Sequence, residues 1–433
     1  MNSESCECSK SELELFTVPP TNISMEKGMY VEGMPISTLT HGSPIEFNIS
    51  SSEEYIDVGR TVLYIKAKIT KNSKFEKCAA DAKVGPVNLW LHSLFSQVDI
   101  KLNGKLITPS VNTYPYRAYL ETLLSYGSDA KESQLTSELW YQDKAPMDEV
   151  NPLAENLKNT GLVERGKLTA ASKSVEMIGR LHCDIFQQDR YLLNGVEMNV
   201  KLIPSGEKFH LMADGTTWTT VIEDACLYVR KVKLNPSIPV QHNKLLSSGK
   251  FAKYPIRRAV VTSFTIPTGN LSINKDNVIM GQLPRRMVIG LVSNRAFNGA
   301  MNASPYNFQH YDVNYMAMYV DGVQFPAKPL TPAFADNQYL RSYMTLFEGT
   351  GMLHDNRGHG IDRAKYKEGF AMYAFDLTAD MAEGSHVDPI KHGTVRIDLH
   401  FKTPLTETVN VVVYSEYDNL IQIDRVRNVV VDY

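Results

Sequence analysis

The stretch VDIKLNGKLITPSVNTYPYRAYLETLLSYG, from Val98 to Gly127, changes its side-chain pattern halfway along. Apolar and polar residues alternate as far as Asn103-Gly104, a pair that tolerates the positive φ angles needed by a two-residue hairpin turn. Beyond the turn, large apolar residues recur at helical spacing, with Tyr116 and Tyr119 on one face. The stretch therefore predicts a β-hairpin that is followed by a tyrosine-rich helix.

The same order recurs in the second half of the chain. The segment VNYMAMYVDGVQFPA has Asp321-Gly322 at its predicted turn, and NQYLRSYMTLFEG follows with Tyr339 and Tyr343. Three more pairs of segments keep this order. The segment IGRLHCDIFQQD pairs with GFAMYAFDLTAD, which aligns Asp184 with Asp376. The segment GVEMNVKLIPS pairs with GTVRIDLHFKTP, and DACLYVRK pairs with NVVVYSEY. The repeat indicates a distant duplication. It predicts two β-sandwiches of short strands, each with one helix after its hairpin.

The pattern also suggests boundaries along the chain. Residues 1–40 have no persistent period and are interpreted as an extended arm, of which residues 1 to about 12 are expected to be ordered only by neighbours. A first sandwich is predicted over 41–240 and a second over 241–433. The polar, helix-leaning residues 127–172 are interpreted as an insertion that the second half mostly lacks, and residues 233–253 as the connector.

The tyrosines of both predicted helices are interpreted as core residues rather than as a ligand site. A helix that packs across one end of a sandwich through tyrosine and leucine covers apolar surface there. After the insertion, strands are expected to resume at 175–186 and 196–204. Cys183 and Cys226 lie in strand-like runs and are expected to be small apolar core residues.

Composition limits the class of protein. The chain has 433 residues, 43% apolar and 21% charged, as expected of a chain with a real core. The net charge of −3 does not favour a nucleic-acid coat or a polybasic membrane surface. The sequence has no apolar run of about 18 residues and starts with the polar MNSESCECSKSELEL, so neither a transmembrane helix nor a secretory signal is expected. Five scattered cysteines fit a reducing compartment.

One motif suggests a nucleotide site. Residues Gly161–Lys167 fit the G-x-x-x-x-G-K pattern of phosphate-binding loops. Leu168 stands where the magnesium-binding hydroxyl should be, and the preceding segment NPLAENLKNT is polar instead of a buried strand. We therefore expect no nucleotide there.

Other candidate sites are no stronger. The segment His354–His359 has two histidines and a carboxylate, so a metal is conceivable, but a solvated glycine-rich loop is the preferred interpretation. Cys6 and Cys8 could bind metal or cross-link subunits, although an exposed tail is the simpler interpretation. His182 and Cys183 are neighbours, so on a strand they point to opposite faces and form no nucleophile–base pair. The sequence predicts no catalytic, cofactor-binding or metal-binding residues.

Three stretches carry a resemblance to a known family. They are SELELFTVPPTNISMEKG (Ser11–Gly28), VGPVNLWLHSLFSQVDIKLNG (Val84–Gly104) and NTYPYRAYLETLLSYGSDAKESQLTS (Asn112–Ser137). Together they resemble the major capsid protein, a hexon-like protein, of Polinton/Maverick elements and adintoviruses. The resemblance covers roughly the first third of the chain, whereas the second half matches through its architecture.

The resemblance implies a fold and a function. The expected fold is all-β with short helices, a tandem double jelly roll of two eight-stranded antiparallel sandwiches. The expected function is a non-enzymatic major capsid protein whose pseudo-hexameric homotrimers tile an icosahedral shell around double-stranded DNA. Neighbouring trimers and a penton or minor capsid protein are the implied partners. The implied location is the virion, with synthesis in the host cytoplasm and assembly in the nucleus. Residues 127–172 and 272–314 are expected to reach neighbours and clamp the ring.

Two other classes of function are compatible with β-sandwiches. A jelly roll can also serve as a carbohydrate- or receptor-binding, lectin-like protein. An enzyme on a cupin-like scaffold would need a histidine–carboxylate cluster on adjacent strands, and the sequence has no close His-x-His spacing. Basic pairs such as Arg257-Arg258 and Arg285-Arg286 are interrupted by acidic and apolar residues, so strong direct nucleic-acid binding is not expected.

Overall fold

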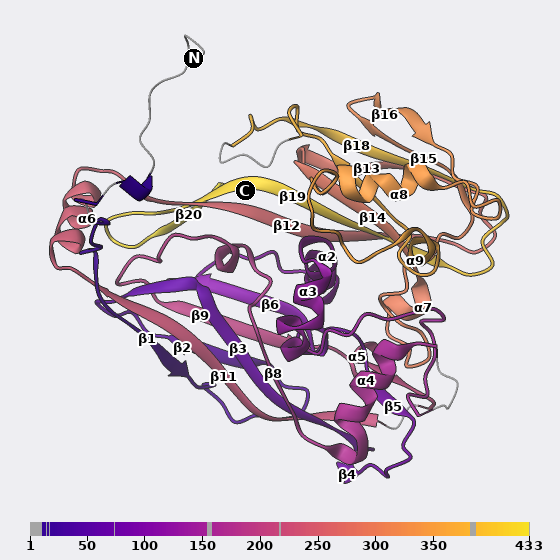
Figure 1. Cartoon of the computed structure of the whole chain (residues 1–433), viewed down its shortest axis with the longest axis horizontal. Helices are drawn as coiled ribbons and strands as arrows, with labels where there is room; N and C mark the ends of the chain where they lie inside the picture. The colour runs from indigo at the N-terminus through magenta and orange to yellow at the C-terminus, as the bar shows by residue number, and fades with distance from the viewer. Residues whose placement is uncertain are drawn as a thin grey trace.

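The structure is a computed structural model that describes residues 11–13, 15–16, 18–72, 74–153, 158–215, 218–381 and 387–432. The expectations for residues 1–10, including Cys6 and Cys8, therefore lie outside the described residues. Figure 1 shows two β-sandwiches, one from each half of the chain, with helices between them.

The first sandwich contains two antiparallel four-stranded sheets and three short extra strands. One sheet has the order β1-β11-β3-β8, with strands β1 (Met25–Gly33), β11 (Trp218–Leu234), β3 (Tyr55–Lys71) and β8 (Val175–Gly179). The other has the order β2-β9-β6-β7, with strands β2 (Ile45–Ile49), β9 (Met198–Pro204), β6 (Phe95–Leu102) and β7 (Lys105–Leu106). The extra strands are β4 (Glu76–Lys77), which pairs with β3, and the pair β5 (Val84–Pro86) and β10 (Leu211–Ala213).

The second sandwich has the same construction. One sheet has the order β12-β19-β14-β17, with strands β12 (Ala252–Ile266), β19 (Val409–Ile423), β14 (Arg286–Ser293) and β17 (Met372–Asp376). The other has the order β13-β18-β15-β16, with strands β13 (Ser272–Gln282), β18 (His392–Phe401), β15 (Val313–Val320) and β16 (Val323–Leu330). A short strand, β20 (Val429–Val431), pairs with the end of β19.

The topology of the two sandwiches is identical. When the eight principal strands of each are counted in chain order, both have one sheet of order 1-8-3-6 and another of order 2-7-4-5. All the named strand pairs in these sheets are antiparallel. Two four-stranded sheets of this kind form a jelly roll. The predicted fold class, a tandem double jelly roll, is therefore confirmed.

Helices occupy equivalent places in the two halves. Helix α2 (Tyr114–Ser125) follows the first hairpin, and α8 (Leu340–Glu348) follows the second. The connector between the sandwiches contains helix α6 (Ser237–Ser247), which the sequence analysis did not predict. The other helices of the described residues are η1 (Ser11–Leu13), α1 (Trp90–Ser93), α3 (Ser128–Glu132), η2 (Gln134–Glu138), α4 (Thr160–Thr169), η3 (Ala170–Ser172), η4 (Asp184–Gln187), α5 (Glu207–His210), α7 (Asn294–Phe297) and α9 (Arg363–Lys367).

Both hairpin turns have the same backbone. The φ angles are 47° at Asn103 and 79° at Gly104, and 50° at Asp321 and 81° at Gly322. Positive φ at both central residues is the arrangement of a type I′ turn, whose twist matches that of the flanking strands. In this left-handed region a Cβ atom is penalised, which explains a glycine at the second position of each turn.

The first residue of each turn also bonds to the neighbouring strand. The Asn103 side chain accepts a 2.8 Å hydrogen bond from the backbone N–H of Glu197, and the Asp321 carboxylate accepts one of 2.8 Å from Thr394. The same side-chain contact is therefore made in both halves, by an amide in one and a carboxylate in the other.

Three boundaries from the sequence analysis need correction. Strand β1 pairs with β11 along its whole length, so the assignment of residues 1–40 to an arm is wrong from Met25 onward. The predicted strand 175–186 ends at Gly179, because η4 follows, and Asp184 therefore does not correspond to Asp376 at the end of β17. The region 272–314 contains the two principal strands β13 and β14, helix α7 and the loop that follows it, so as a whole it is no insertion.

The core has three parts. One fills the first sandwich and also includes Tyr254, Ile256, Ile421 and Ile423 from the ends of β12 and β19. Another fills the second sandwich. A third, which we call the junction core, contains residues of both halves, from Tyr116 and Tyr119 of α2 to Val288, Phe308 and Tyr414 of the second sandwich.

Candidate functional site

Helix α2 lies between the two sandwiches (Figure 1) and is buried on all sides. Eleven consecutive residues, from Tyr114 to Leu124, are buried. A helix that is surrounded by protein in this way belongs to the core of a larger assembly of elements. Pro115 in the first turn suits the helix start, because the first backbone N–H groups have no intrahelical acceptor. Helix α2 thus joins the two halves instead of covering one open end.

An aromatic cluster joins α2 to the loop between α7 and β15. The rings of Tyr119 and Tyr306 stack with centroids 4.0 Å apart and planes 1° from parallel, and Tyr116 stacks on Phe297 at 5.3 Å. The Tyr306 hydroxyl lies 2.6 Å from the hydroxyl of Ser93. The predicted tyrosines of the first half therefore lie in the junction core.

The corresponding tyrosines of the second half lie at α8 and α9. Tyr339 is buried and Tyr343 is half-buried, and both pack against the ring of Tyr366. Their hydroxyls donate 3.0 Å hydrogen bonds to the carbonyls of Arg363 and Ile361. These contacts fix the segment after α8, so the two tyrosine pairs have different neighbours.

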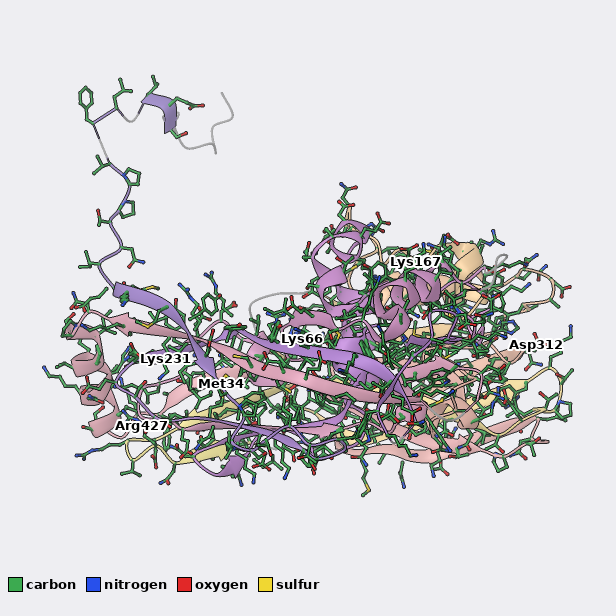
Figure 2. All side chains as sticks on the ribbon, turned by 90° about the horizontal axis from the view of Figure 1, so that it is seen from below. Met34, Lys66, Lys167, Lys231, Asp312 and Arg427 are labelled. Atoms are coloured by element: carbon green, nitrogen blue, oxygen red, sulfur yellow. The ribbon has the colours of Figure 1, made fainter. Side chains whose placement is uncertain are left out.

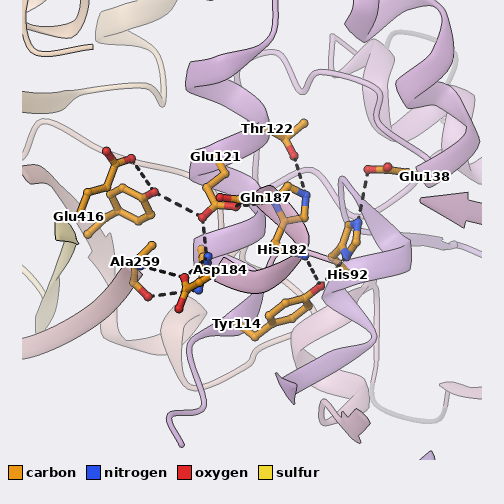
Figure 3. A network of polar contacts seen from close by, with 12 residues as sticks. His92, Tyr114, Glu121, Thr122, Glu138, His182, Asp184, Gln187, Ala259 and Glu416 are labelled. Atoms are coloured by element: carbon orange, nitrogen blue, oxygen red, sulfur yellow. Dashed lines mark hydrogen bonds and ion pairs between the residues drawn. The ribbon is translucent and has the colours of Figure 1, made fainter. Parts of the chain in front are cut away.

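A buried ion-pair network crosses the junction. Arg117 of α2 lies 2.8 Å from the Glu121 carboxylate and 2.7 Å from Asp184, and it donates a 3.2 Å hydrogen bond to the carbonyl of Ala259 on β12. Asp184 in turn accepts a 3.1 Å hydrogen bond from the backbone N–H of Ala259. The Tyr414 hydroxyl of β19 lies 2.8 Å from the Glu416 carboxylate and 3.4 Å from that of Glu121 (Figure 3). Side chains of the first half are thereby bonded to two strands of the second.

The ionisation of this network follows from its contacts. Burial acts to raise the pKa of Glu121, but Arg117 and the imidazole of His182 lower it to about 2. Burial raises the pKa of Asp184, although Arg117 acts in the opposite direction. A buried carboxylate that loses its partner leaves an uncompensated charge, so the network makes the relative position of the halves specific.

A polar cavity of about 410 Å³ adjoins this network. It is lined by residues of both sandwiches, among them the four arginines Arg180, Arg257, Arg286 and Arg357. Arg286 forms ion pairs with Asp376 and Glu416 and is buried, as is its neighbour Arg285. This basic pair therefore does not lie on a solvated face of the chain.

The insertion at 127–172 packs within its own chain. Asp148 accepts a 2.8 Å hydrogen bond from the backbone of Ser304 and one of 3.1 Å from the side chain of Asn307. These two hydrogen bonds join the insertion to the loop after α7.

The phosphate-loop motif lies in a helix. Residues Gly161–Lys167 belong to α4, whose first turn is capped by the side chain of Asn159. A Cβ at Gly166 would clash with Pro152, so close packing requires this glycine. Lys167 is exposed and pairs with Glu164 at 2.7 Å. The motif has no loop in which backbone N–H groups could surround a phosphate.

The histidine loop is only partly solvated. His354 is exposed, but His359 is fully buried, and its Nε2 lies 3.1 Å from the Leu346 carbonyl and 2.9 Å from the hydroxyl of Thr350. The interpretation of the whole segment as a solvated loop is wrong for His359. Burial lowers the pKa of this imidazole to about 4. Cys183 and Cys226 are buried.

The structure brings together one cluster that the sequence analysis missed. His92, Glu138 and His182 are buried next to one another beside α2 (Figure 3). They are more than about 40 residues apart in sequence, far beyond the spacings of sequence motifs for metal sites. Only the fold places them in contact.

Comparison with known proteins adds the fold relationship. No protein-family model matches the chain. An uncharacterized protein of Caenorhabditis elegans is 25% identical over 404 residues, which covers 90% of this chain and 93% of that protein. A chain in the structure of the Sputnik virophage aligns with a TM-score of 0.69 at 11% identity and covers 99% of this chain and 93% of that one.

Two further solved structures show the same similarity. The mavirus major capsid protein aligns with a TM-score of 0.54 at 13% identity over 98% of this chain and 93% of that one. A chain of the PBCV-1 virus capsid aligns with a TM-score of 0.58 at 10% identity over 96% of this chain and 99% of that one. The chain has the fold of viral major capsid proteins. No helix of the described chain has the length and apolar character that a membrane span requires.

Proposed function

We propose that the protein is a non-enzymatic major capsid protein of the Polinton/Maverick and adintovirus type. Three chains form a homotrimer of pseudo-hexagonal outline, and these trimers tile an icosahedral shell around double-stranded DNA. The partners are neighbouring trimers and a penton or minor capsid protein. The chain is made in the host cytoplasm, and the shell assembles in the nucleus. The fold of the mavirus and PBCV-1 capsid chains supports this role.

One observation carries the proposal: two sandwiches of identical topology share the junction core. A chain of this kind presents two similar units in one fixed orientation. Three copies around a threefold axis place six similar units in a ring, and a rotation of 120° closes their heterologous contacts. A ring with this outline tiles a surface hexagonally, which a two-domain monomer does not.

The N-terminal segment gives independent support. Its described residues 18–24 lead away from the body of the molecule, and η1 lies beyond them (Figure 2). The side chains of Leu13, Leu15, Phe16 and Val18 are 68%, 76%, 98% and 88% exposed. Several large apolar side chains in water on one segment mark an interaction site. In the proposed shell, a neighbouring copy of the chain covers them.

Mass photometry of the purified protein over a dilution series tests the trimer. We expect a species of three times 48.7 kDa, together with hexagonal arrays or shell fragments in negative-stain images at high concentration. The double variant Leu15→Ser, Phe16→Ser should reduce the arrays, whereas the matched double variant Lys167→Ser, Leu168→Ser on exposed α4 positions should not. A folded monomer that persists at the highest concentration would contradict the proposal and favour the lectin-like alternative.

A further inference from the structure

Three possible metal ligands lie together beside the ion-paired part of the junction. His92 comes from α1, Glu138 is the last residue of η2, and His182 lies in the segment between β8 and η4. One ligand atom of each lies within 4.8 Å of the other two, and all three residues are buried. Figure 3 shows the two imidazoles next to each other, with the Glu138 carboxylate at His92.

In both imidazoles the nitrogen Nδ1 already has a polar neighbour within hydrogen-bond distance. His182 Nδ1 lies 2.6 Å from the Glu121 carboxylate, which as a carboxylate can only accept, so Nδ1 is the donor and Nε2 is the ring nitrogen available to a metal ion. His92 Nδ1 lies 2.9 Å from the hydroxyl of Tyr114. A histidine that binds metal usually donates its other N–H to a carboxylate or a similar acceptor. The pair of Glu121 and His182 has this arrangement, with the Thr122 hydroxyl 3.4 Å from Nε2.

The two atoms that His92 and Glu138 direct toward each other lack hydrogen-bond partners among the described residues. His92 Nε2 lies 3.4 Å from Glu138 Oε2, and neither atom has a hydrogen-bond partner in the described structure. Ligand atoms of a tetrahedral zinc ion lie about 3.3 Å apart, given metal–ligand distances near 2.0 Å. The spacing of these two atoms thus suits a shared cation better than a direct hydrogen bond. The room for the carboxylate depends on Gly179, because a Cβ there would overlap the Glu138 side chain.

Charge in the cluster favours a cation. The Glu138 carboxylate lies beside two imidazoles in a buried site, where an uncompensated charge is costly. Arg117, the nearby permanent cation, is already bonded to Glu121 and Asp184.

We propose that His92, Glu138 and His182 form a structural site for a divalent transition-metal ion. Two imidazoles and one carboxylate suit zinc, which also accepts a water molecule as fourth ligand. The ion joins η2 of the helical insertion to α1 and to the segment after β8, and so fixes the insertion on the first sandwich. The site lies within one chain and does not depend on the capsid function.

Metal binding by the full-length protein tests this proposal. The protein is treated with EDTA, dialysed, and titrated with Zn²⁺ and separately with Co²⁺. We expect one zinc per chain by elemental analysis, a higher Tm with zinc, and the visible absorption bands of tetrahedral cobalt. A folded wild-type chain that binds no zinc and no cobalt would overturn the proposal.

Three variants locate the site. Glu138→Gln keeps the shape and a hydrogen-bonding group but removes the anionic ligand, so zinc affinity should fall by at least about 100-fold. Glu121→Gln removes the carboxylate behind His182, which also pairs with Arg117, and should weaken zinc binding about 10- to 100-fold while Tm reports the loss of the ion pair separately. His354→Ala, at an exposed histidine outside the cluster, is the matched control and should bind zinc as wild type does. Equal zinc affinity in Glu138→Gln and His354→Ala would assign the metal to another site and overturn the proposal.

Discussion

At the scale of single residues, the two halves use the same turn chemistry. Asn103 and Asp321 both combine a left-handed backbone with a side chain that bonds to the next strand. Gly104 and Gly322 follow them, and no atom lies within 4 Å of the position that a Cβ would take on either glycine. Any cost of a side chain there arises from backbone strain and not from a clash.

Substitution of Gly104 by valine measures this strain. We expect Gly104→Val to lower the free energy of unfolding by about 1–2 kcal/mol, because a β-branched residue resists positive φ. Urea denaturation of both proteins gives the difference. Gly358→Val is the matched control, since that position is also open but has no positive φ. Equal losses in the two variants would show that backbone strain is not the cause.

Lys131 is a buried cation without a carboxylate partner in the described ion pairs. Its ammonium group donates 2.6 Å hydrogen bonds to the carbonyls of Leu123 and His359. Burial, with a smaller contribution from Lys365, lowers the pKa of Lys131 to about 7. This residue fixes the start of the helical insertion to the backbone of the buried His359.

Lys131 predicts a dependence of stability on pH. Between pH 7 and the ordinary pKa of 10.5, the unfolded chain binds more protons at this residue than the folded chain does. Its contribution to stability therefore rises with pH in this window and is constant below it. We expect Lys131→Met to remove part of the increase in unfolding free energy between pH 7 and 9, whereas Lys167→Met should not. Identical pH profiles for wild type and Lys131→Met would contradict the lowered pKa.

At the scale of elements, α2 and the pair β12–β19 hold the molecule together. Strands β12 and β19 are paired over all fifteen residues of each. Alternate residues of β19 face different cores: Val411 and Val413 belong to the second sandwich, whereas Val412 and Tyr414 belong to the junction core. Because successive side chains of a strand point to opposite faces, the single strand β19 contributes apolar residues to two cores.

Removal of the buried cation of α2 tests the ion-pair network. We expect Arg117→Met to lower the unfolding free energy by about 3–5 kcal/mol, because Glu121 and Asp184 are left as buried charges. Addition of Asp184→Asn in the same chain should recover part of this loss. A loss below about 1 kcal/mol, the range of exposed ion pairs, would show that the network is open to solvent.

At the scale of the whole molecule, the junction core makes the two sandwiches one folding unit. Tyr119 and Tyr306 come from different halves and stack at 4.0 Å within it. The core of the first sandwich also includes residues of β12 and β19. Neither half can therefore unfold without exposing apolar surface of the other.

Calorimetry checks this coupling. We expect a single thermal transition for the wild-type chain, and a single transition at lower Tm for Tyr306→Ala, since loss of a buried aromatic ring costs about 3–5 kcal/mol. Val323→Ala, at an exposed position of β16, should leave Tm nearly unchanged. Two separate transitions in the wild-type chain would mean that each sandwich is stable alone.

Much of the fold could be predicted from local sequence patterns. The turn pairs, the tyrosine-rich helices and the order of repeated segments predicted two β-sandwiches, each with a helix after its hairpin, because turn chemistry and side-chain periodicity act over a few residues. The jelly-roll topology was an implication of the family resemblance. The same local rules missed β1, whose side chains are mostly exposed, so that no alternation of apolar and polar residues marks it. They also missed α6 in the connector.

The sequence by itself therefore determined the type and order of the elements, while the tertiary structure decided what lies together. The contacts of Arg117 with Asp184 and Ala259, and the cluster of His92, Glu138 and His182, join residues that are distant in sequence. Local propensity does not encode such contacts, since they form only when packing excludes water from several elements at once. The burial that creates the junction core also sets the charges of its polar groups, and for this reason the candidate sites appear only in the folded chain.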